Sequence, residues 1–372
     1  MQFVDLGAQR TRIKDKINAA VLRVLESGQY ILGPKVTEFE EQLADYLGVK
    51  HVVACANGTD ALKMPLMAKN IGPGDAVFCP SFTFSATAEV VALVGAEPVF
   101  VDVLPDTFNM DSDKLCEAIE MIKQEGRLKP KAVIAVDLFG LPADFSKIAT
   151  VAAKENLFVI EDAAQSMGGR SGHTMCGAFG DVAATSFYPA KPLGCYGDGG
   201  AMMTNDDDLA LLLRSILFHG KGKNQYDNVR IGLNSRLDTI QAAILLEKLV
   251  IFEDEIEKRT AIAQRYFDGL KDVVIVPEVG EEDRCAYAQY TIKVENRDQL
   301  KAYLQESSIP TMIYYNTPLH LQEAYKNFPY VKGSLSVSEN LGNCVLSLPM
   351  YPYLLPNDQD TIIEKIRDFY HA

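Results

Sequence analysis

The sequence contains no tryptophan, only five histidines, and no Cys-x-x-Cys pair among its seven cysteines. The dispersed histidines lack the spacing of metal ligands, so we expect no metal site. An odd number of scattered cysteines is typical of free thiols in a reducing compartment. This pattern predicts a cytoplasmic protein and argues against a disulfide-stabilised secreted one.

Long apolar runs are also missing. The most apolar stretch, residues 90–101, is interrupted by Gly95, Glu97 and Pro98, which argues against a membrane-spanning helix. No basic patch followed by an apolar run opens the chain, so we expect no signal peptide. The net charge of -14 argues against nucleic-acid binding, which depends on clustered Lys and Arg. An anionic substrate would therefore have to meet local basic residues.

The chain of 372 residues suits two domains, at about 150 residues per domain. Short apolar runs alternate with helical patterns at 51–56, 76–79, 98–103, 132–138 and 157–160. Such runs imply an α/β fold with a parallel sheet covered on both faces, in which ligands bind at the carboxyl ends of the strands. Asn57, Phe82, Asp162 and Lys191 all lie at or just beyond such ends.

The pattern changes in the last third of the chain. Residues 239–270 read as one long helix with a break, and short strands at 287–294 and 311–314 alternate with helices near 297–305 and 361–369. We place the domain boundary in the long helix. This gives a large domain over residues 1–245 and a smaller C-terminal domain over residues 246–372.

A lysine stands in a proline-rich turn between Pro189 and Pro192, and Asp162 closes an apolar run twenty-nine positions before it. Most lysines are solvated surface groups, but Pro192 favours an extended backbone at Lys191. The pair suits pyridoxal phosphate, held as a Schiff base on Lys191 while Asp162 keeps the pyridine nitrogen protonated. The alternative for Asp162 is a buried carboxylate that caps the helix after it.

The turn Asn57-Gly58-Thr59 opens a predicted helix and suits a phosphate group. Gly58 lets the backbone approach an anion, the Thr59 hydroxyl adds a donor, and a helix N-terminus offers unpaired amides. Ser186 is placed to share the same phosphate. A simple helix cap at Asn57 or Thr59 is the alternative.

Three further residues have two interpretations each. Phe82 either stacks on the pyridine ring or belongs to the core. Gln165 either lies near the phenolic oxygen of the ring or simply follows a capping carboxylate. Arg236 either binds a substrate carboxylate through two parallel hydrogen bonds or is a solvated charge beside a helix.

Together these segments resemble the nucleotide-sugar aminotransferases of the DegT/DnrJ/EryC1/StrS family. The matching motifs lie across nearly the whole chain, at residues 28–34, 57–62, 161–166, 186–189, 197–200, 232–238 and 318–320. The resemblance implies the fold-type-I architecture of pyridoxal-phosphate-dependent transferases such as aspartate aminotransferase. This architecture has a large α/β domain, with a mostly parallel mixed sheet between helices, and a smaller C-terminal α+β domain.

The resemblance also implies a role for each matched residue. The cofactor phosphate would be held by Gly58, Thr59 and Ser186, the ring by Asp162 and Gln165, and the reactive carbon by Lys191. Asn234 would reach the phosphate from the partner subunit, which implies a homodimer with shared active sites. Tyr314, Tyr315 and His320 are candidates for binding the sugar. Some relatives carry histidine in place of the lysine and are sugar dehydratases, so Lys191 favours the aminotransferase branch.

Within the family, residues 188–200, 234–238 and 348–350 are most similar to the enzymes that aminate UDP-2-acetamido-2-deoxy-3-oxo-D-glucuronate at carbon 3. These enzymes serve bacterial surface polysaccharide, including the O-antigen of lipopolysaccharide. This chain has Tyr314 and Tyr351 where those relatives often have histidine. Because both positions are expected to face the sugar, two alternatives stay open. The substrate could be a 4-keto or 3-keto-6-deoxyhexose carried by UDP or dTDP, or the chain could be an idle regulatory member of the family.

The implied reaction has two halves. L-glutamate gives its amino group to the cofactor and leaves as 2-oxoglutarate, and the amino group then passes to the keto-sugar. Lys191 would serve as the general base in both halves. The resemblance therefore predicts ping-pong kinetics.

Overall fold

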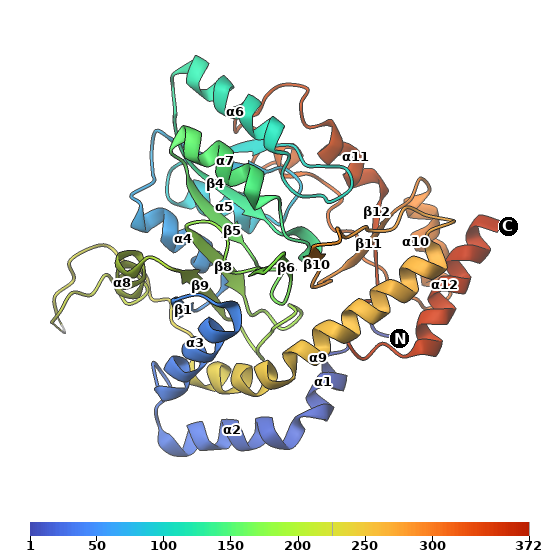
Figure 1. Ribbon diagram of the computed structural model, residues 1–372, viewed down its shortest axis with the longest axis horizontal. Coiled ribbons are helices and arrows are strands. Elements are labelled where there is room, and N and C mark those ends of the chain that lie inside the picture. Colours follow the sequence, from blue (N-terminus) through green and yellow to red (C-terminus); the bar gives the residue numbers. More distant parts are fainter. Residues whose placement is uncertain (225, 372) are drawn as a thin grey trace.

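The computed structural model describes residues 1–224 and 226–371, and a seven-stranded sheet forms its centre (Figure 1). The strands are β1 (His51–Cys55), β2 (Asp75–Pro80), β3 (Glu97–Val101), β4 (Lys129–Val136), β5 (Phe158–Asp162), β8 (Val182–Ser186) and β9 (Gly200–Thr204). Their order is β1-β9-β8-β5-β4-β2-β3. Only β9 runs antiparallel to its neighbours β1 and β8, so the predicted mostly parallel mixed sheet is confirmed.

Helices cover both faces of this sheet (Figure 1). One face packs against α4 (Gly58–Ala68), α5 (Ala86–Leu93) and α8 (Asp207–Ile216). The other face packs against α3 (Pro34–Leu47), α6 (Ser112–Glu125), α7 (Phe145–Glu155) and the start of α9 (Thr239–Leu270). Alternate residues of one strand enter opposite cores, since Val53 packs with α4 and Val52 packs with α3.

The long helix α9 links the sheet to a second core. It runs unbroken from Thr239 to Leu270, so the break that we expected within it is absent. Its C-terminal half packs with α10 (Arg297–Glu306), α12 (Pro356–His371) and the two-stranded sheet of β11 (Tyr290–Lys293) and β12 (Val345–Leu348). The predicted boundary between residues 245 and 246 lies inside α9 and stays a prediction.

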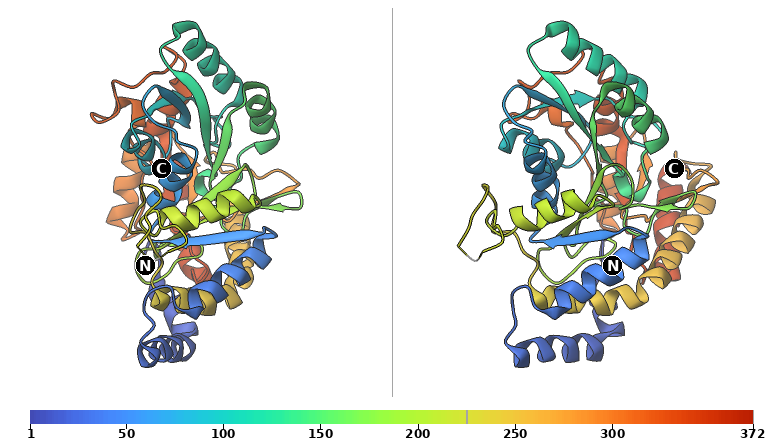
Figure 2. Two further views of the ribbon diagram at one scale, coloured as in Figure 1. Left: turned by 90° about the vertical axis from the view of Figure 1, so that its left-hand side faces the viewer. Right: turned by 60° about the vertical axis from the view of Figure 1, so that its left-hand side comes forward.

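The remaining elements are short or lie at the periphery. They are α1 (Leu6–Arg12), α2 (Lys14–Ser27), β6 (Arg170–Ser171), β7 (Thr174–Met175), β10 (Asp283–Arg284) and α11 (Ser336–Cys344), with 3-10 turns at Leu138–Gly140 and Leu319–Leu321. Helix α2 lies along α9, and the connection from α8 to α9 extends away from the body of the molecule (Figure 2).

The strand expected at residues 311–314 does not form. Met312 makes a single bridge to Ser347, and a turn begins at Tyr314. The turn presents Tyr314 and Tyr315 to a cavity beside the large sheet, which an extended strand would not do. Over the described residues, no helix is both long enough and apolar enough to cross a membrane.

Candidate active site

A cavity of about 550 Å³ opens at the carboxyl ends of the parallel strands. Its walls include Asn57 after β1, Asp162 at the end of β5 and Ser186 at the end of β8. The loop between β8 and β9 brings Lys191 into the same space. This volume and this position are typical of a small-molecule site in an α/β sheet.

Asp162 and Lys191 both line this cavity, and their opposite charges interact. Asp162 is 5% exposed and accepts hydrogen bonds from the Thr87 hydroxyl at 3.0 Å and from the Ala164 amide at 3.2 Å. Burial raises the pKa of Asp162, while these two donors and the charge of Lys191 oppose the rise. Burial also lowers the pKa of Lys191, and Asp162 opposes that shift. The pair therefore joins a carboxylate to an amine that loses its proton more readily than a surface lysine does.

The loop that carries Lys191 is held by its own backbone. The Lys191 amide donates to the Tyr188 carbonyl at 2.9 Å, and the Cys195 amide donates to the Phe187 carbonyl at 2.8 Å. The chain folds so closely that a Cβ on Gly194 would lie 2.6 Å from the Tyr188 carbonyl oxygen. Glycine is therefore required at this position, as expected for a tight wall around a ligand.

A cradle for an anion forms where α4 begins. Asn57 caps the helix by accepting from the Asp60 amide at 2.8 Å, so the capping alternative is correct for Asn57. Among the hydrogen bonds of residues 1–224 and 226–371, none uses the amides of Gly58 or Thr59. A Cβ on Gly58 would lie 2.7 Å from the Cβ of Ser186. These two free amides and the Ser186 hydroxyl thus converge at a helix N-terminus, the usual place for a phosphate.

Gln165 and Tyr315 form another part of the cavity wall. The side-chain oxygen of Gln165 accepts a hydrogen bond from the Phe139 backbone amide at 2.8 Å. This bond directs the side-chain nitrogen of Gln165 toward the Tyr315 hydroxyl at 3.4 Å. Burial raises the pKa of Tyr315 above its ordinary value, so its hydroxyl stays protonated. This wall therefore offers hydrogen-bond donors beside Asp162.

Phe82 does not line the cavity, so the core alternative describes it. It is 1% exposed and packs in a cluster with Phe108 and Leu138. Phe84, two residues later, is 55% exposed and lines the cavity instead. The sequence placed both aromatic residues after β2, but only the path of the chain beyond Pro80 decides which ring faces the ligand. Phe84 is therefore the aromatic ring that is placed to face a planar ligand in this cavity.

The candidate sugar-binding residues divide into two groups. Tyr314 and Tyr315 line the cavity. Gln289, which was not among the candidates predicted from the sequence, lines it too. His320 is 3% exposed, and its ring nitrogens bond Ser81 at 2.6 Å and Glu339 at 3.2 Å, away from the cavity. Tyr351 also lies outside the cavity, in the core of the C-terminal unit. Neither His320 nor Tyr351 lines this cavity, although Tyr351 lines an adjacent hollow together with Lys191.

Asn234 and Arg236 do not line this cavity either. Both lie in the projecting connection between α8 and α9, where the Arg236 guanidinium donates to the Asn234 side chain. The guanidinium also lies 5.0 Å from the centre of the Phe218 ring. Asn234 is exposed, and Arg236 is half-buried. Within one subunit, the structure does not bring these residues to the cavity.

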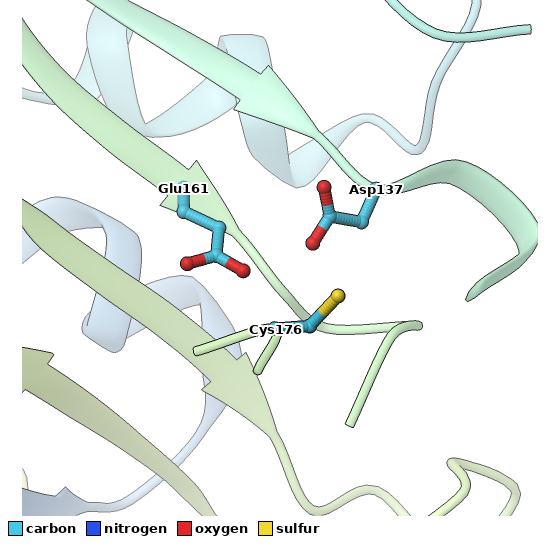
Figure 3. Close-up of side chains that lie close together, drawn as sticks. All are labelled: Asp137, Glu161 and Cys176. Carbon is cyan, nitrogen blue, oxygen red and sulfur yellow. The ribbon is translucent and has the colours of Figure 1, made fainter. Parts of the chain in front are cut away.

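The buried carboxyl groups of Asp137 and Glu161 form a pair near the end of β5. Figure 3 shows this pair together with Cys176. Their potential metal-ligating atoms lie within 4.8 Å of one another. Each carboxylate oxygen already accepts a hydrogen bond, from Ala143 and Ser166 for Asp137 and from Gly177 and Phe179 for Glu161. Burial raises the pKa of Asp137 to about 6 and raises that of Glu161 well above its ordinary value. Burial and the closeness of two carboxyl groups account for both shifts in pKa.

The residues of the cavity fit pyridoxal phosphate. Free helix amides and a serine hydroxyl suit its phosphate, and a buried carboxylate suits its protonated ring nitrogen. The exposed ring of Phe84 suits its planar face, and an amine with a lowered pKa suits its aldehyde. The phosphate, the ring nitrogen, the ring face and the aldehyde of the cofactor thus each have a matching group within one cavity.

A family model described as the DegT/DnrJ/EryC1/StrS aminotransferase family matches residues 11–367. The chain is 49% identical over 356 residues to the UDP-2-acetamido-2-deoxy-3-oxo-D-glucuronate aminotransferase of Pseudomonas aeruginosa, covering 95% of this chain and 96% of that protein.

Solved structures agree with the sequence match. A DegT DnrJ EryC1 StrS aminotransferase from Brucella abortus superposes with a TM-score of 0.99 at 65% identity, covering 100% of both chains. NtdA from Bacillus subtilis, solved with bound cofactor PMP, superposes with a TM-score of 0.90 at 30% identity, covering 100% of this chain and 85% of that one.

Proposed function

The chain belongs to the DegT/DnrJ/EryC1/StrS aminotransferase family, and we propose that it transfers the amino group of L-glutamate to carbon 3 of UDP-2-acetamido-2-deoxy-3-oxo-D-glucuronate. It is a pyridoxal-phosphate-dependent aminotransferase of fold type I. The observation that carries the proposal is the single cavity that joins Lys191, Asp162 and the phosphate cradle at the N-terminus of α4.

Pyridoxal phosphate, when bound, supplies an electron sink for the negative charge that forms as a proton leaves the α-carbon of the donor. Asp162 would hold the proton of the ring nitrogen and keep this sink cationic. Thr87 and Ala164 fix the orientation of Asp162 through their hydrogen bonds. The amides of Gly58 and Thr59, with the hydroxyl of Ser186, would anchor the phosphate.

Lys191 acts as the general base. Its nitrogen would take the proton from the α-carbon of the donor. In the second half of the reaction it would deliver a proton to the sugar carbon that receives the amino group. A general base works best when its pKa lies near the working pH, and burial lowers the pKa of Lys191 in that direction. Tyr315 and Phe84 line the same cavity beside Asp162 and Lys191.

The charges in the cavity support a homodimer with shared active sites. Lys191 is the one cationic side chain among the described residues that line the cavity, whereas Asp162 and Asp198 are acidic. L-glutamate, a uronate and a diphosphate would add several negative charges, which need more positive partners. We propose that Asn234 and Arg236 enter this cavity from a second subunit, where Arg236 would bind a carboxylate.

The surface around these residues suits such a partner. Tyr30, Ile31 and Leu32 are exposed by 47% to 49%, and Ile31 forms a bridge to Asp238 close to Arg236. Ile231, in the projecting connection, is 86% exposed. Exposed apolar side chains gathered beside one connection are typical of a protein interface. Sedimentation at micromolar concentration should show a dimer, and a monomer with full activity would contradict the shared site.

The substrate assignment can be tested directly. The purified protein is incubated with L-glutamate and a panel of UDP- and dTDP-linked keto-sugars, and the products are followed by mass spectrometry. We expect amination of the 3-keto uronate and release of 2-oxoglutarate, with nuclear magnetic resonance locating nitrogen on carbon 3. Amination of a neutral hexose in preference to the uronate would contradict the proposal.

A 3-keto-6-deoxyhexose or a 4-keto sugar is the second candidate substrate. Tyr314 lines the cavity at the position where the related uronate enzymes often have histidine. A tyrosine hydroxyl lacks the positive charge that a histidine can offer to a carboxylate. Replacing Tyr314 with His should improve kcat/KM for the uronate if this position faces its carboxylate. An improvement for the neutral sugar alone would favour the second candidate.

An idle regulatory role would predict protein that takes up no pyridoxal phosphate. We propose that the chain is active in the cytoplasm, in the synthesis of a surface polysaccharide such as the lipopolysaccharide O-antigen. Loss of the gene would then remove di-N-acetylated uronic acid from the polysaccharide.

We also propose that α9 carries the boundary between the large domain of residues 1–245 and the smaller domain of residues 246–372.

A further inference from the structure

A buried lysine lies directly behind the loop that carries Lys191. Lys248, on α9, is 2% exposed, and its ammonium donates to the carbonyl oxygen of Gly194. The same nitrogen lies 4.2 Å from the centre of the Tyr196 ring. Gly194 is three residues beyond Lys191, so this contact fixes the end of the turn from which Lys191 enters the cavity.

Lys248 occupies a costly environment. Lysine is almost never fully buried unless it is paired. Among the described residues, no carboxylate lies within ion-pair distance of Lys248, and burial lowers its pKa to about 8 although the charge of Glu255 opposes this shift. An apolar side chain would fill the same space without this cost. The donated hydrogen bond and the contact with Tyr196 are what an apolar residue could not provide.

The same face of α9 holds the loop at a second point. Gln241, seven residues before Lys248, accepts from the Tyr196 amide at 2.9 Å and donates to the Tyr196 carbonyl at 3.4 Å. Farther along this helix, Arg259 donates to the carbonyls of Tyr287 at 2.8 Å and Met350 at 3.4 Å in the C-terminal unit. One rigid helix therefore ties the lysine loop to the C-terminal core.

We propose that Lys248 is a positioning residue for Lys191: by holding the Gly194 carbonyl it keeps the Lys191 nitrogen at the place from which it moves protons. The proposal rests on the aminotransferase activity but not on the identity of the donor or the sugar. Small displacements of a reacting group can lower rates by up to about a hundredfold. A loop without this hydrogen bond should therefore still bind ligands but should react slowly.

The test compares Lys248→Met, which keeps most of the apolar volume and removes the donor, with Lys258→Met on the same helix. Lys258 is 41% exposed and pairs with Asp254 at 2.9 Å, away from the loop. We expect Lys248→Met to lower kcat by about tenfold to a hundredfold while KM changes little. The pH midpoint of the visible absorbance of bound pyridoxal phosphate should also shift. Lys258→Met should change none of these values.

Hydrogen exchange on the cofactor-free protein gives a readout that needs no substrate. The amides of Lys191 and Cys195 are bonded within the loop, and we expect them to exchange faster in Lys248→Met than in the wild type. Because absorbance and exchange need neither glutamate nor a sugar, they report on Lys248 even if the proposed substrates are wrong.

A Lys248→Met protein that melts at a lower temperature but keeps the wild-type kcat, pH midpoint and exchange rates would overturn the proposal and leave Lys248 a stabilising residue only. If this variant does not fold, Lys248→Gln replaces it, since glutamine is polar but one bond too short to reach Gly194. The same loss of kcat at constant KM would support the proposal, and wild-type values would overturn it.

Discussion

Glu161 and Asp162 are neighbours at the end of β5, yet their carboxylates have opposite surroundings. Glu161 faces the interior, where it lies with Asp137 and Cys176 (Figure 3). Its two oxygens accept hydrogen bonds from the backbone amides of Gly177 and Phe179. Asp162 faces the cavity and lies opposite the charge of Lys191. Successive side chains of a strand point to opposite faces, so one residue step separates a carboxyl group buried in the core from one that lines the cavity.

The difference shows that burial alone does not make a functional carboxylate. Burial raises the pKa of both residues. Glu161 accepts hydrogen bonds from two backbone amides and lies beside the acidic Asp137. Burial and this acidic neighbour favour its protonated form. Asp162 has an open cavity and an amine, so it can stabilise a cation that enters the cavity.

Removing the amine beside Asp162 should have the largest effect. Lys191→Ala should lower kcat for amino transfer by about 10⁴-fold or more, because the general base is lost. The aldehyde of the bound cofactor would then have no lysine amine to react with, so the visible absorbance of the cofactor should also change. Steady-state kinetics and absorbance spectra measure both effects. Lys258→Ala is the matched control, and a Lys191→Ala protein with near-normal turnover would refute the assignment.

Neutralising the catalytic carboxylate should have the next largest effect. Asp162→Asn keeps the shape and the bonds from Thr87 but removes the charge that stabilises a protonated ring. We expect kcat to fall by about 10²-fold to 10³-fold, as for the loss of one strong electrostatic contact in an active site. Asp137→Asn, in the neighbouring pair, should leave kcat nearly unchanged. Equal losses in the two variants would remove the distinction between the pairs.

Phe82 and Phe84 offer a similar contrast between core and cavity. Phe82→Ala should lower the free energy of unfolding by about 3 kcal/mol or more, because a fully buried ring leaves a cavity. Phe84→Ala should change stability little but should weaken the binding of pyridoxal phosphate. Denaturant unfolding and cofactor titration separate the two effects. Weakened cofactor binding only in Phe82→Ala would restore the original assignment of the stacking ring.

The carboxyl pair should affect mainly the pH dependence of stability. The folded-state pKa of Asp137 is raised to about 6 from 3.8, so its retained proton stabilises the folded protein at low pH. This stabilisation is lost as the pH rises through about 6. In Asp137→Asn the Ser166 hydroxyl can reverse its role and accept from the new amide, so the variant should fold.

The measurement is the free energy of unfolding at about pH 5 and about pH 8, and the loss between these values should be smaller in Asp137→Asn by roughly 1 to 3 kcal/mol. Cys176→Ala keeps both carboxyl groups and serves as the control, so it should retain the wild-type loss. An unchanged loss in Asp137→Asn would mean that the pair shares no proton.

Much of the fold was predictable because apolar runs and capping residues act locally. The sequence predicted five strands of the large sheet and the helices α4, α10 and α12. The reversal of β9 was not predicted, because strand direction depends on how the chain returns after the lysine loop. The helices α1 and α2 and the unbroken course of α9 also went unrecognised, since their stability comes from packing on one another.

Some residues of the site were likewise predictable from the sequence, and others were not. Asp162, Lys191, Gly58 and Ser186 all reached one cavity, because their positions follow directly from strand ends and a helix start. Phe84 and Gln289 were missed, since a ring in a turn and an amide from a distant segment carry no local signal. His320 was selected because it lies in a motif that resembles the family, but Ser81 and Glu339 bind both of its ring nitrogens.

The sequence by itself determined which chemical groups this protein has and along which strands they are delivered, because hydrophobic periodicity, proline and glycine constrain the backbone within a few residues. Only the tertiary structure decided which aromatic ring faces the ligand, which of two adjacent carboxylates meets a cation, and which buried lysine supports Lys191. These choices depend on contacts between segments far apart in the chain, whose free energies no local pattern records.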